Sequence, residues 1–254
     1  MIELNKIYNE DCLIGLKKID DESIDLTVTS PPYDNLRTYN GYSFDFENIA
    51  KELFRVTKNG GVVMWNVGDQ VVNGSESGTS FRQALYFIEL GFNLHDTMIY
   101  EKNSSTFPAS KKGNRYTQIF EYMFVFSKGK QKTSNLIIDK ENKWAGHKDF
   151  SGKLKNEVPK YSPRNNIWKY TTSFNDKTDH PAVFPEQLAQ DHILSWSNKN
   201  DVVLDIFMGS GTTAKMAILN DRNYLGFEIS EEYCNIANER IKDLEKQTDI
   251  FEFI

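Results

Sequence analysis

Short apolar segments of strand length alternate with amphipathic segments of helical period along most of this chain. Several of the apolar segments are nearly continuous hydrophobic runs, as expected of strands covered on both faces. They span residues 6–9, 24–29, 61–67, 95–100, 119–126, 202–207 and 224–229. Helical patterns lie between them, at residues 46–57, 80–90, 185–197, 212–219 and 231–245. The alternation predicts an α/β fold built on a doubly wound, mostly parallel sheet of seven strands.

One segment interrupts the alternation. Residues 130–178 are polar and basic, with isolated aromatic side chains such as Trp144, Trp168 and Tyr170. A structureless loop of this length is uncommon inside a compact domain. We therefore expect an insert, either a small subdomain or a segment ordered by a partner, that separates residues 1–129 from residues 179–254 of the same domain.

The charge distribution favours a polyanionic partner, although the net charge is −6. Residues 101–178 hold 16 Lys and Arg against 7 Asp and Glu, whereas the rest of the chain holds 14 against 29. An acidic body with a basic middle is suited to nucleic acid. A solvated, lysine-rich insert is the alternative.

Composition predicts a soluble, cytoplasmic protein. Apolar runs stay well short of the roughly 18 residues that a membrane span needs, and the N-terminal residues lack a signal-peptide pattern. The two cysteines, Cys12 and Cys234, are far apart and suggest neither a disulfide framework nor a zinc site. We expect no metal and no membrane partner.

A glycine turn between a strand and a helix, DIFMGSGTT (Asp205–Thr213), is the first chemical signal. Gly209 and Gly211 allow a sharp turn and close approach of a ligand, and the amides that begin the helix favour a negative group. Glu228 ends the next strand, where a carboxylate can accept hydrogen bonds from both hydroxyls of a ribose. The unit predicts a nucleoside-cofactor site; a tight turn with an incidental Glu is the alternative.

The sequence TSPPY (Thr29–Tyr33), directly after a strand, is the second signal. Two prolines remove two backbone donors and fix two φ angles. The segment is either a rigid turn or a platform that holds one flat group beside Tyr33.

Together the two signals resemble the amino-methyltransferases of DNA. DIFMGSGTT is similar to that family's S-adenosylmethionine motif, and TSPPY to its catalytic motif. HPAVFPEQL (His180–Leu188) and NEDCLIGL (residues 9–16) are similar to two further family motifs. The order of catalytic motif, variable segment and cofactor motif resembles the circularly permuted β class.

The resemblance implies a catalytic half (1–129), a target-recognition insert (130–178) and a cofactor-binding half (179–254), with double-stranded DNA as partner and a homodimer as a possibility. It implies a catalytic set of Ser30, Pro31, Pro32 and Tyr33. It implies that S-adenosyl-L-methionine is bound by Asp11, Cys12, Ser30, His180, Pro181, Pro185, Asp205, Phe207, Met208, Gly209, Ser210, Gly211, Thr212, Thr213 and Glu228. Asp11 could instead be a helix N-cap, Cys12 a small buried side chain and His180 a structural residue.

An exocyclic amine lies inside the base stack of duplex DNA, so the target base must be flipped out. Tyr33 is expected to stack on it, while Ser30 Oγ and a carbonyl of Ser30 or Pro31 accept its two N–H groups. Because Ser30 is a weak base, we expect direct in-line transfer to the neutral amine, with the proton lost afterwards and no covalent enzyme intermediate.

Family resemblance also favours N4 of cytosine over N6 of adenine. Ser30 stands where adenine enzymes commonly carry Asp, and Phe184 where many β-class adenine enzymes carry Lys. Three alternatives remain: methylation of RNA or of a protein amide, a non-catalytic nucleic-acid-binding relic, and a nicotinamide dehydrogenase. The glycine turn lacks the third glycine of the dinucleotide fingerprint, which disfavours the dehydrogenase.

Overall fold

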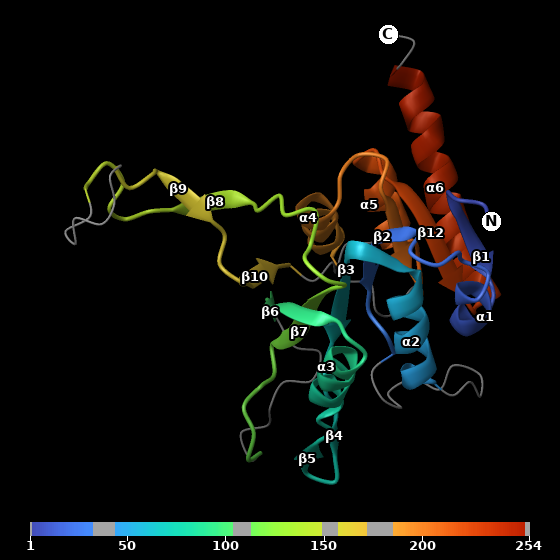
Figure 1. Ribbon diagram of the computed structural model, residues 1–254, viewed down its shortest axis with the longest axis horizontal. Helices are drawn as coiled ribbons and strands as arrows, with labels where there is room; N and C mark the ends of the chain where they lie inside the picture. The colour runs from blue at the N-terminus through green and yellow to red at the C-terminus, as the bar shows by residue number, and fades with distance from the viewer. Residues whose placement is uncertain (1, 33–43, 104–112, 149–156, 172–184, 252–254) are drawn as a thin grey trace.

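The computed structural model describes residues 2–32, 44–103, 113–148, 157–171 and 185–251, with side chains up to residue 244 (Figure 1). Its central sheet has the strand order β1-β12-β11-β2-β3-β7-β6-β10. These strands are β1 (Lys6–Asn9), β2 (Ile24–Thr29), β3 (Thr57–Val67), β6 (Asn93–Lys102), β7 (Phe120–Ser127), β10 (Ile167–Tyr170), β11 (Val202–Asp205) and β12 (Asn223–Glu228). All neighbours are parallel except that β7 runs antiparallel to β3 and β6.

This arrangement confirms the predicted α/β class and the mostly parallel sheet, which has one strand more than the seven expected. The additional strand, β10, lies within the residues assigned to the insert and pairs with β6 at the sheet edge. Its sequence IWKY alternates, so that Trp168 and Tyr170 are buried in the main core while Ile167 and Lys169 face outward. These two aromatic residues therefore belong to the main sheet and its core and not to a separate small core.

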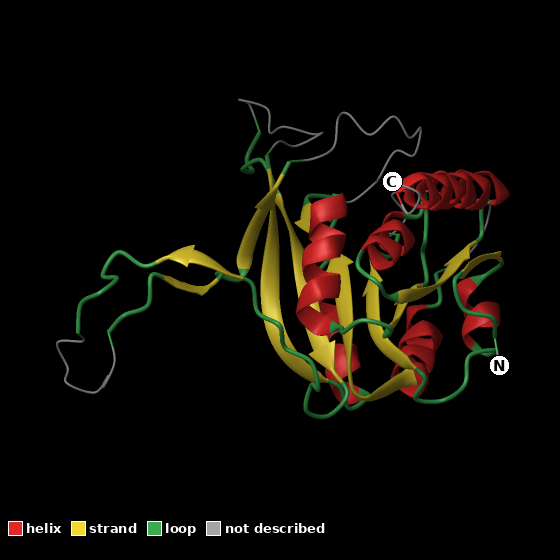
Figure 2. Cartoon of the chain, turned by 90° about the horizontal axis from the view of Figure 1, so that it is seen from above, coloured by secondary structure: helices red, strands yellow, loops and turns green. Residues whose placement is uncertain are grey.

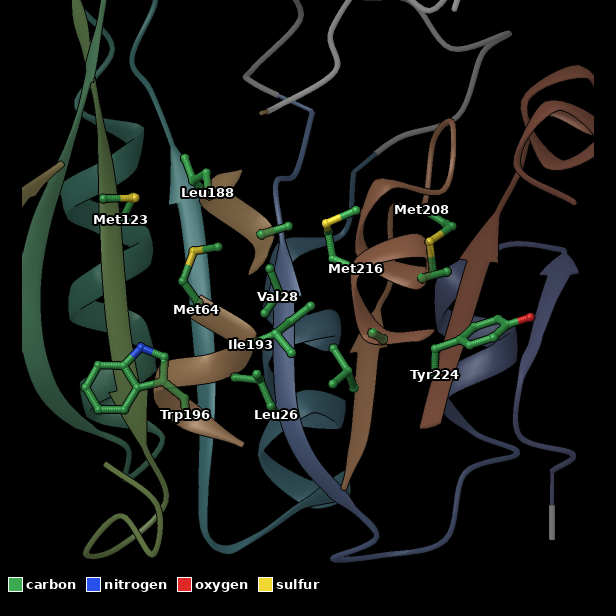
Figure 3. Close-up of a cluster of buried hydrophobic side chains, with 14 of the residues drawn as sticks. Leu26, Val28, Met64, Met123, Leu188, Ile193, Trp196, Met208, Met216 and Tyr224 are labelled. Atoms are coloured by element: carbon green, nitrogen blue, oxygen red, sulfur yellow. The ribbon is translucent and has the colours of Figure 1, made fainter. Parts of the chain in front are cut away.

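Within the described part of the chain, six helices cover the two faces of the sheet (Figure 2). They are α1 (Cys12–Leu16), α2 (Phe46–Val56), α3 (Thr79–Glu89), α4 (Glu186–Trp196), α5 (Thr212–Leu219) and α6 (Glu231–Phe251). Residues of α1, α2 and α3 share one hydrophobic core, and those of α4, α5 and α6 share the other. Figure 3 shows the second core, in which Leu188, Ile193 and Trp196 of α4 lie against Val28 and Met64 of the sheet.

Two short antiparallel pairs stand outside the main sheet. β4 (Val71–Val72) pairs with β5 (Ser75–Glu76), and β8 (Ile138–Glu141) pairs with β9 (Tyr161–Pro163). The β8–β9 pair forms an arm that projects far from the body in both views (Figures 1 and 2). Arg164, at the base of this arm, ties it to the body by ion pairs with Asp139 on β8 and Asp191 on α4. The described residues of the insert thus form an anchored arm followed by a strand of the main sheet.

Among the described residues, we find no helix that is both long enough and apolar enough to cross a membrane.

Candidate active site

The strands that carry the sequence signals end together at the carboxyl edge of the sheet. β12 lies between β1 and β11, and β2 lies next to β11. Glu228 pairs in register with Asn9, and Asn9 Nδ2 donates to the carbonyl of Glu228 at 2.9 Å. In open α/β sheets, ligands bind at this carboxyl edge. The fold therefore brings the segments that hold Asp11, Ser30, Asp205 and Glu228 to one place.

The glycine turn between β11 and α5 has the backbone shape that its sequence predicts. Gly209 has φ +53° and Gly211, the N-cap of α5, has φ +84°, both in the left-handed region that favours glycine. A Cβ on Gly211 would also lie 2.9 Å from the Cβ of Ala237 on α6. Any other residue at position 211 would therefore be strained and would push α6 away. No side-chain hydrogen bond caps α5 at Gly211, so neither Thr212 nor Thr213 acts as a cap.

Asp205, at the end of β11, connects β2, β11 and α5 through hydrogen bonds to its carboxylate. Its carboxylate is buried and accepts hydrogen bonds from Thr29 Oγ1 and Thr213 Oγ1, each at 2.7 Å, and from the backbone N–H of Phe207 at 3.0 Å. Burial raises the pKa of Asp205 to about 6. The side chain thus joins the end of β2 to the start of α5, and Thr29, which sequence analysis left without a role, supplies one of the contacts.

Glu228, at the end of β12, also contacts the glycine turn. Its carboxylate accepts hydrogen bonds from the N–H of Gly209 at 2.8 Å and of Ser230 at 2.9 Å. Burial raises the pKa of this carboxyl above its ordinary range. A carboxylate has about four lone-pair sites, so two backbone contacts leave acceptor capacity for a ligand.

Asp11 and Cys12 lie near Glu228 at the start of α1. Asp11 is the N-cap of α1, and its Oδ1 accepts from the N–H of Leu13 at 2.8 Å and of Ile14 at 3.4 Å. Burial, together with the negative charge of Asp11, raises the pKa of the Cys12 thiol to about 12. A thiol with this pKa stays protonated at neutral pH and does not act as a nucleophile.

The hydroxyl of Thr212 is buried and has no hydrogen-bond partner among the described residues. Buried hydroxyls normally have a partner, so an unsatisfied one beside a ligand-binding turn marks a place for a ligand atom. Thr212 Oγ1, the first amides of α5 and the carboxylate of Glu228 supply donors and acceptors of the kinds that an amino-acid-bearing nucleoside would need. The residues present fit such a cofactor.

Arg240 on α6 is a residue of this site that sequence analysis missed. Its guanidinium donates to the carbonyl of Ser210 at 2.7 Å and to Ser210 Oγ at 3.0 Å, and it pairs with Glu186 at 2.8 Å. Glu186 opens α4 directly after the buried Pro185. Arg240 therefore connects the glycine turn to the α4 motif, and only tertiary packing shows it, because nothing in the helical pattern of α6 separates Arg240 from its surface lysines.

Replacing Arg240 with methionine should weaken cofactor binding by about 5- to 10-fold, because the glycine turn loses two charge-assisted hydrogen bonds that hold it in the binding shape. Isothermal titration with S-adenosylmethionine measures this. Lys242→Met, an exposed change two residues further along the same helix, is the control and should leave the affinity unchanged. Equal affinities of the two variants would show that the turn does not depend on Arg240.

The described part of the catalytic motif is Ser30, Pro31 and Pro32. Pro31 is buried, while Ser30 and Pro32 are half-buried at the end of β2. Asn66 Nδ2 on β3 lies 3.4 Å from Ser30 Oγ. Tyr33, His180 and Pro181 lie outside the described residues, so their predicted roles stay predictions.

Three polar residues beside Ser30 were also missed. Asn66 Nδ2 donates to Glu121 on β7 at 2.7 Å, and Glu121 forms an ion pair with Lys102 on β6. A signal for two of them was present, because Asn66 and Glu121 are single polar residues within apolar strand sequences. Such interruptions at the ligand-binding edge of a sheet indicate functional positions.

Among the described residues, no cluster of His, Cys, Asp or Glu side chains could hold a metal ion.

Comparison with known proteins relates this geometry to a family. The profile of the N6/N4 DNA methylase family matches residues 24–239. An orphan methyltransferase, M.BamHII of Bacillus amyloliquefaciens, is 59% identical over 246 residues, which cover 89% of this chain and 92% of that protein.

Two solved structures also superimpose on this chain. The PvuII DNA methyltransferase, described as cytosine-N4-specific, superimposes with a TM-score of 0.70 at 24% identity, covering 91% of this chain and 84% of that one, which shows the shared fold. M1.HpyAVI in complex with SAM superimposes with a TM-score of 0.63 at 25% identity, covering 92% and 98%. The chain therefore belongs to the N6/N4 family of DNA methylases.

Proposed function

We propose that this DNA methyltransferase transfers the methyl group of S-adenosylmethionine to the exocyclic amine of a flipped base, N4 of cytosine. The observation that carries the proposal is the pair of hydrogen bonds that Asp205 accepts from Thr29 and Thr213. These bonds join the strand that leads into the catalytic motif to the helix that begins at the proposed cofactor site. The order of the motifs along the chain supports placement in the permuted β class.

The cofactor is held by residues on both sides of the glycine turn. Glu228 accepts the ribose hydroxyls, Thr212 and the first amides of α5 face the methionine end, and Asp11 lies at the adenine. When bound, S-adenosylmethionine supplies an electrophilic methyl group. Ser30 is linked to this site through its neighbour Thr29, which donates to Asp205 at 2.7 Å.

Ser30 and the main-chain carbonyls of the two-proline segment then orient the target amine. The prolines offer no N–H that would compete for these acceptors. Ser30 Oγ accepts one amine hydrogen, so that the nitrogen lone pair points at the electrophile. Catalysis is mainly orientation and electrostatic placement.

The proposal is tested by incubating the purified chain with unmethylated duplex DNA and S-adenosylmethionine that carries a labelled methyl group. Label should enter DNA and be absent from RNA and protein offered in its place. Transfer to RNA or protein alone would contradict the proposal.

The β8–β9 arm is proposed to contact the DNA. Its exposed lysines include Lys140, Lys143, Lys148 and Lys160, and Trp144 near its tip has 65% of its surface exposed. Lys128, two residues before the insert, donates to the carbonyls of Phe54 and Thr57. The basic surface therefore begins beyond Lys128.

Changing the four arm lysines to glutamine should flatten the salt dependence of DNA affinity. Each phosphate contact contributes about 0.9 to the slope of log K against log salt, so the slope should fall by roughly 3 to 4. Fluorescence anisotropy of labelled duplex at several salt concentrations measures it. The matched control carries four exposed lysines of the body changed to glutamine: Lys17, Lys51, Lys199 and Lys242. A slope that changes in the control and not in the arm variant would place the DNA elsewhere.

A further inference from the structure

Four neighbouring strands carry polar side chains at one level of the sheet. On the face covered by α4, their apolar side chains belong to a single core, which includes Val28 on β2, Met64 on β3, Met123 on β7 and Tyr100 on β6. Residues two positions apart share a face of a strand. Two positions further toward the carboxyl edge, the same rows hold Ser30, Asn66, Glu121 and Lys102. The core thus ends in a row of polar groups directly beside the catalytic motif.

The row is joined by hydrogen bonds across the strands. Glu121 forms an ion pair with Lys102, and their side chains are only 11% and 28% exposed. Glu121 also accepts from Asn66 Nδ2 at 2.7 Å, and Asn66 is fully buried. A carboxylate paired with a lysine can only accept hydrogen bonds. The amide of Asn66 must therefore turn its NH₂ group, and not its oxygen, toward Glu121.

The orientation of the Asn66 amide determines which of its groups faces Ser30. The NH₂ group of Asn66 has two hydrogens; one serves Glu121 and the other faces Ser30 Oγ at 3.4 Å. Catalytic hydrogen bonds are often long without substrate and shorten in the complex. The Asn66 amide thereby places Ser30 Oγ, which can accept hydrogen bonds, where the target amine is proposed to lie. An amide is not a base, so this row orients Ser30 without carrying a proton away from it.

We propose that Asn66 and Glu121 are positioning residues for methyl transfer: Glu121 fixes the amide of Asn66, which holds Ser30 Oγ as the acceptor for the target amine. The proposal rests on the proposed function, in which Ser30 contacts that amine. Lys102 supports it through its ion pair with Glu121.

A double-mutant cycle tests the proposal, read out as the single-turnover rate of methyl transfer to DNA at saturating cofactor. Asn66→Ala should slow transfer by about 10- to 100-fold, and Glu121→Gln by about 3- to 10-fold. The affinity for S-adenosylmethionine, measured by titration calorimetry, should stay within about twofold, because neither residue touches the glycine turn. Asp25→Asn is the matched control: Asp25 on β2 is also a half-buried carboxylate paired with a lysine, Lys58, and it stands at the opposite edge of the sheet.

The decisive variant combines Ser30→Ala with Asn66→Ala. If Asn66 acts through Ser30, the double variant should be no slower than Ser30→Ala alone, to within about twofold. Rate losses that multiply would overturn the proposal, and so would an equal loss in Asp25→Asn. Should Glu121→Gln not fold, as thermal unfolding would show, the Ser30–Asn66 pair still decides the matter. A wild-type chain that labels no DNA would instead overturn the proposed function itself.

Discussion

Replacing Glu228 with alanine is expected to weaken S-adenosylmethionine binding by about 10²- to 10⁴-fold, because two charge-assisted hydrogen bonds at about 1.5–3 kcal/mol each are lost. The same change releases the N–H groups of Gly209 and Ser230, which Glu228 holds at 2.8 and 2.9 Å. Titration calorimetry gives the dissociation constant directly.

Two further variants separate the ribose contact from the shape of the turn. Glu228→Gln keeps an acceptor for the backbone amides and loses the charge, so its affinity should fall between those of wild type and Glu228→Ala. Glu231→Ala removes an exposed carboxylate at the start of α6 and should have no effect. An unchanged dissociation constant for Glu228→Ala would remove this residue from the cofactor site.

Replacing Asp205 with alanine should lower the free energy of unfolding by roughly 3–5 kcal/mol, because a buried hydrogen-bond network is broken. Three buried donors lose their acceptor: Thr29 Oγ1, Thr213 Oγ1 and the N–H of Phe207. Chemical denaturation measures the loss. A change below about 1 kcal/mol, the size typical of an average substitution, would show that the three segments are held together by other contacts.

Asp205→Asn isolates the charge from the hydrogen bonds. Burial raises the pKa of Asp205 to about 6 from the ordinary 3.8, so the folded chain binds this proton more readily than the unfolded chain. The stabilisation from protonation is complete below pH 3.8 and is lost as the pH rises through about 6. Between pH 4 and 7, wild type should therefore lose on the order of 2–3 kcal/mol relative to Asp205→Asn. A difference independent of pH would contradict the raised pKa.

The framework of the fold was predictable from the sequence because long periodic segments determine it. The predicted strand at residues 6–9 and the predicted helix at residues 212–219 coincide with β1 and α5. The five-residue α1 was absent from the predicted helices and was anticipated only by the alternative that Asp11 is a helix N-cap, since it is too short to show a helical period.

Within the insert, the local sequence pattern was insufficient to predict the structure. β10 has four residues, and its membership of the main sheet depends on pairing with β6, some 70 positions earlier in the chain. Trp168 was therefore interpreted as part of a separate region, although it lies in the main core.

The residues of the candidate site likewise include some that the sequence could predict and some that it could not. Gly211 was predictable because a turn of this kind needs a residue that tolerates positive φ. Arg240 and Lys102 were not, because an arginine on a charged helix and a lysine at a strand end look like surface residues until the chain folds.

The most direct test of the central claim is mass spectrometry of nucleosides from unmethylated duplex DNA treated with the enzyme and methyl-labelled S-adenosylmethionine. We expect label in N4-methylcytosine. Label only in N6-methyladenine would contradict the choice of base and leave the mechanism at an exocyclic amine standing. Label in C5-methylcytosine would contradict both, because methylation of ring carbon requires a covalent enzyme nucleophile, for which the buried, protonated thiol of Cys12 is unsuited.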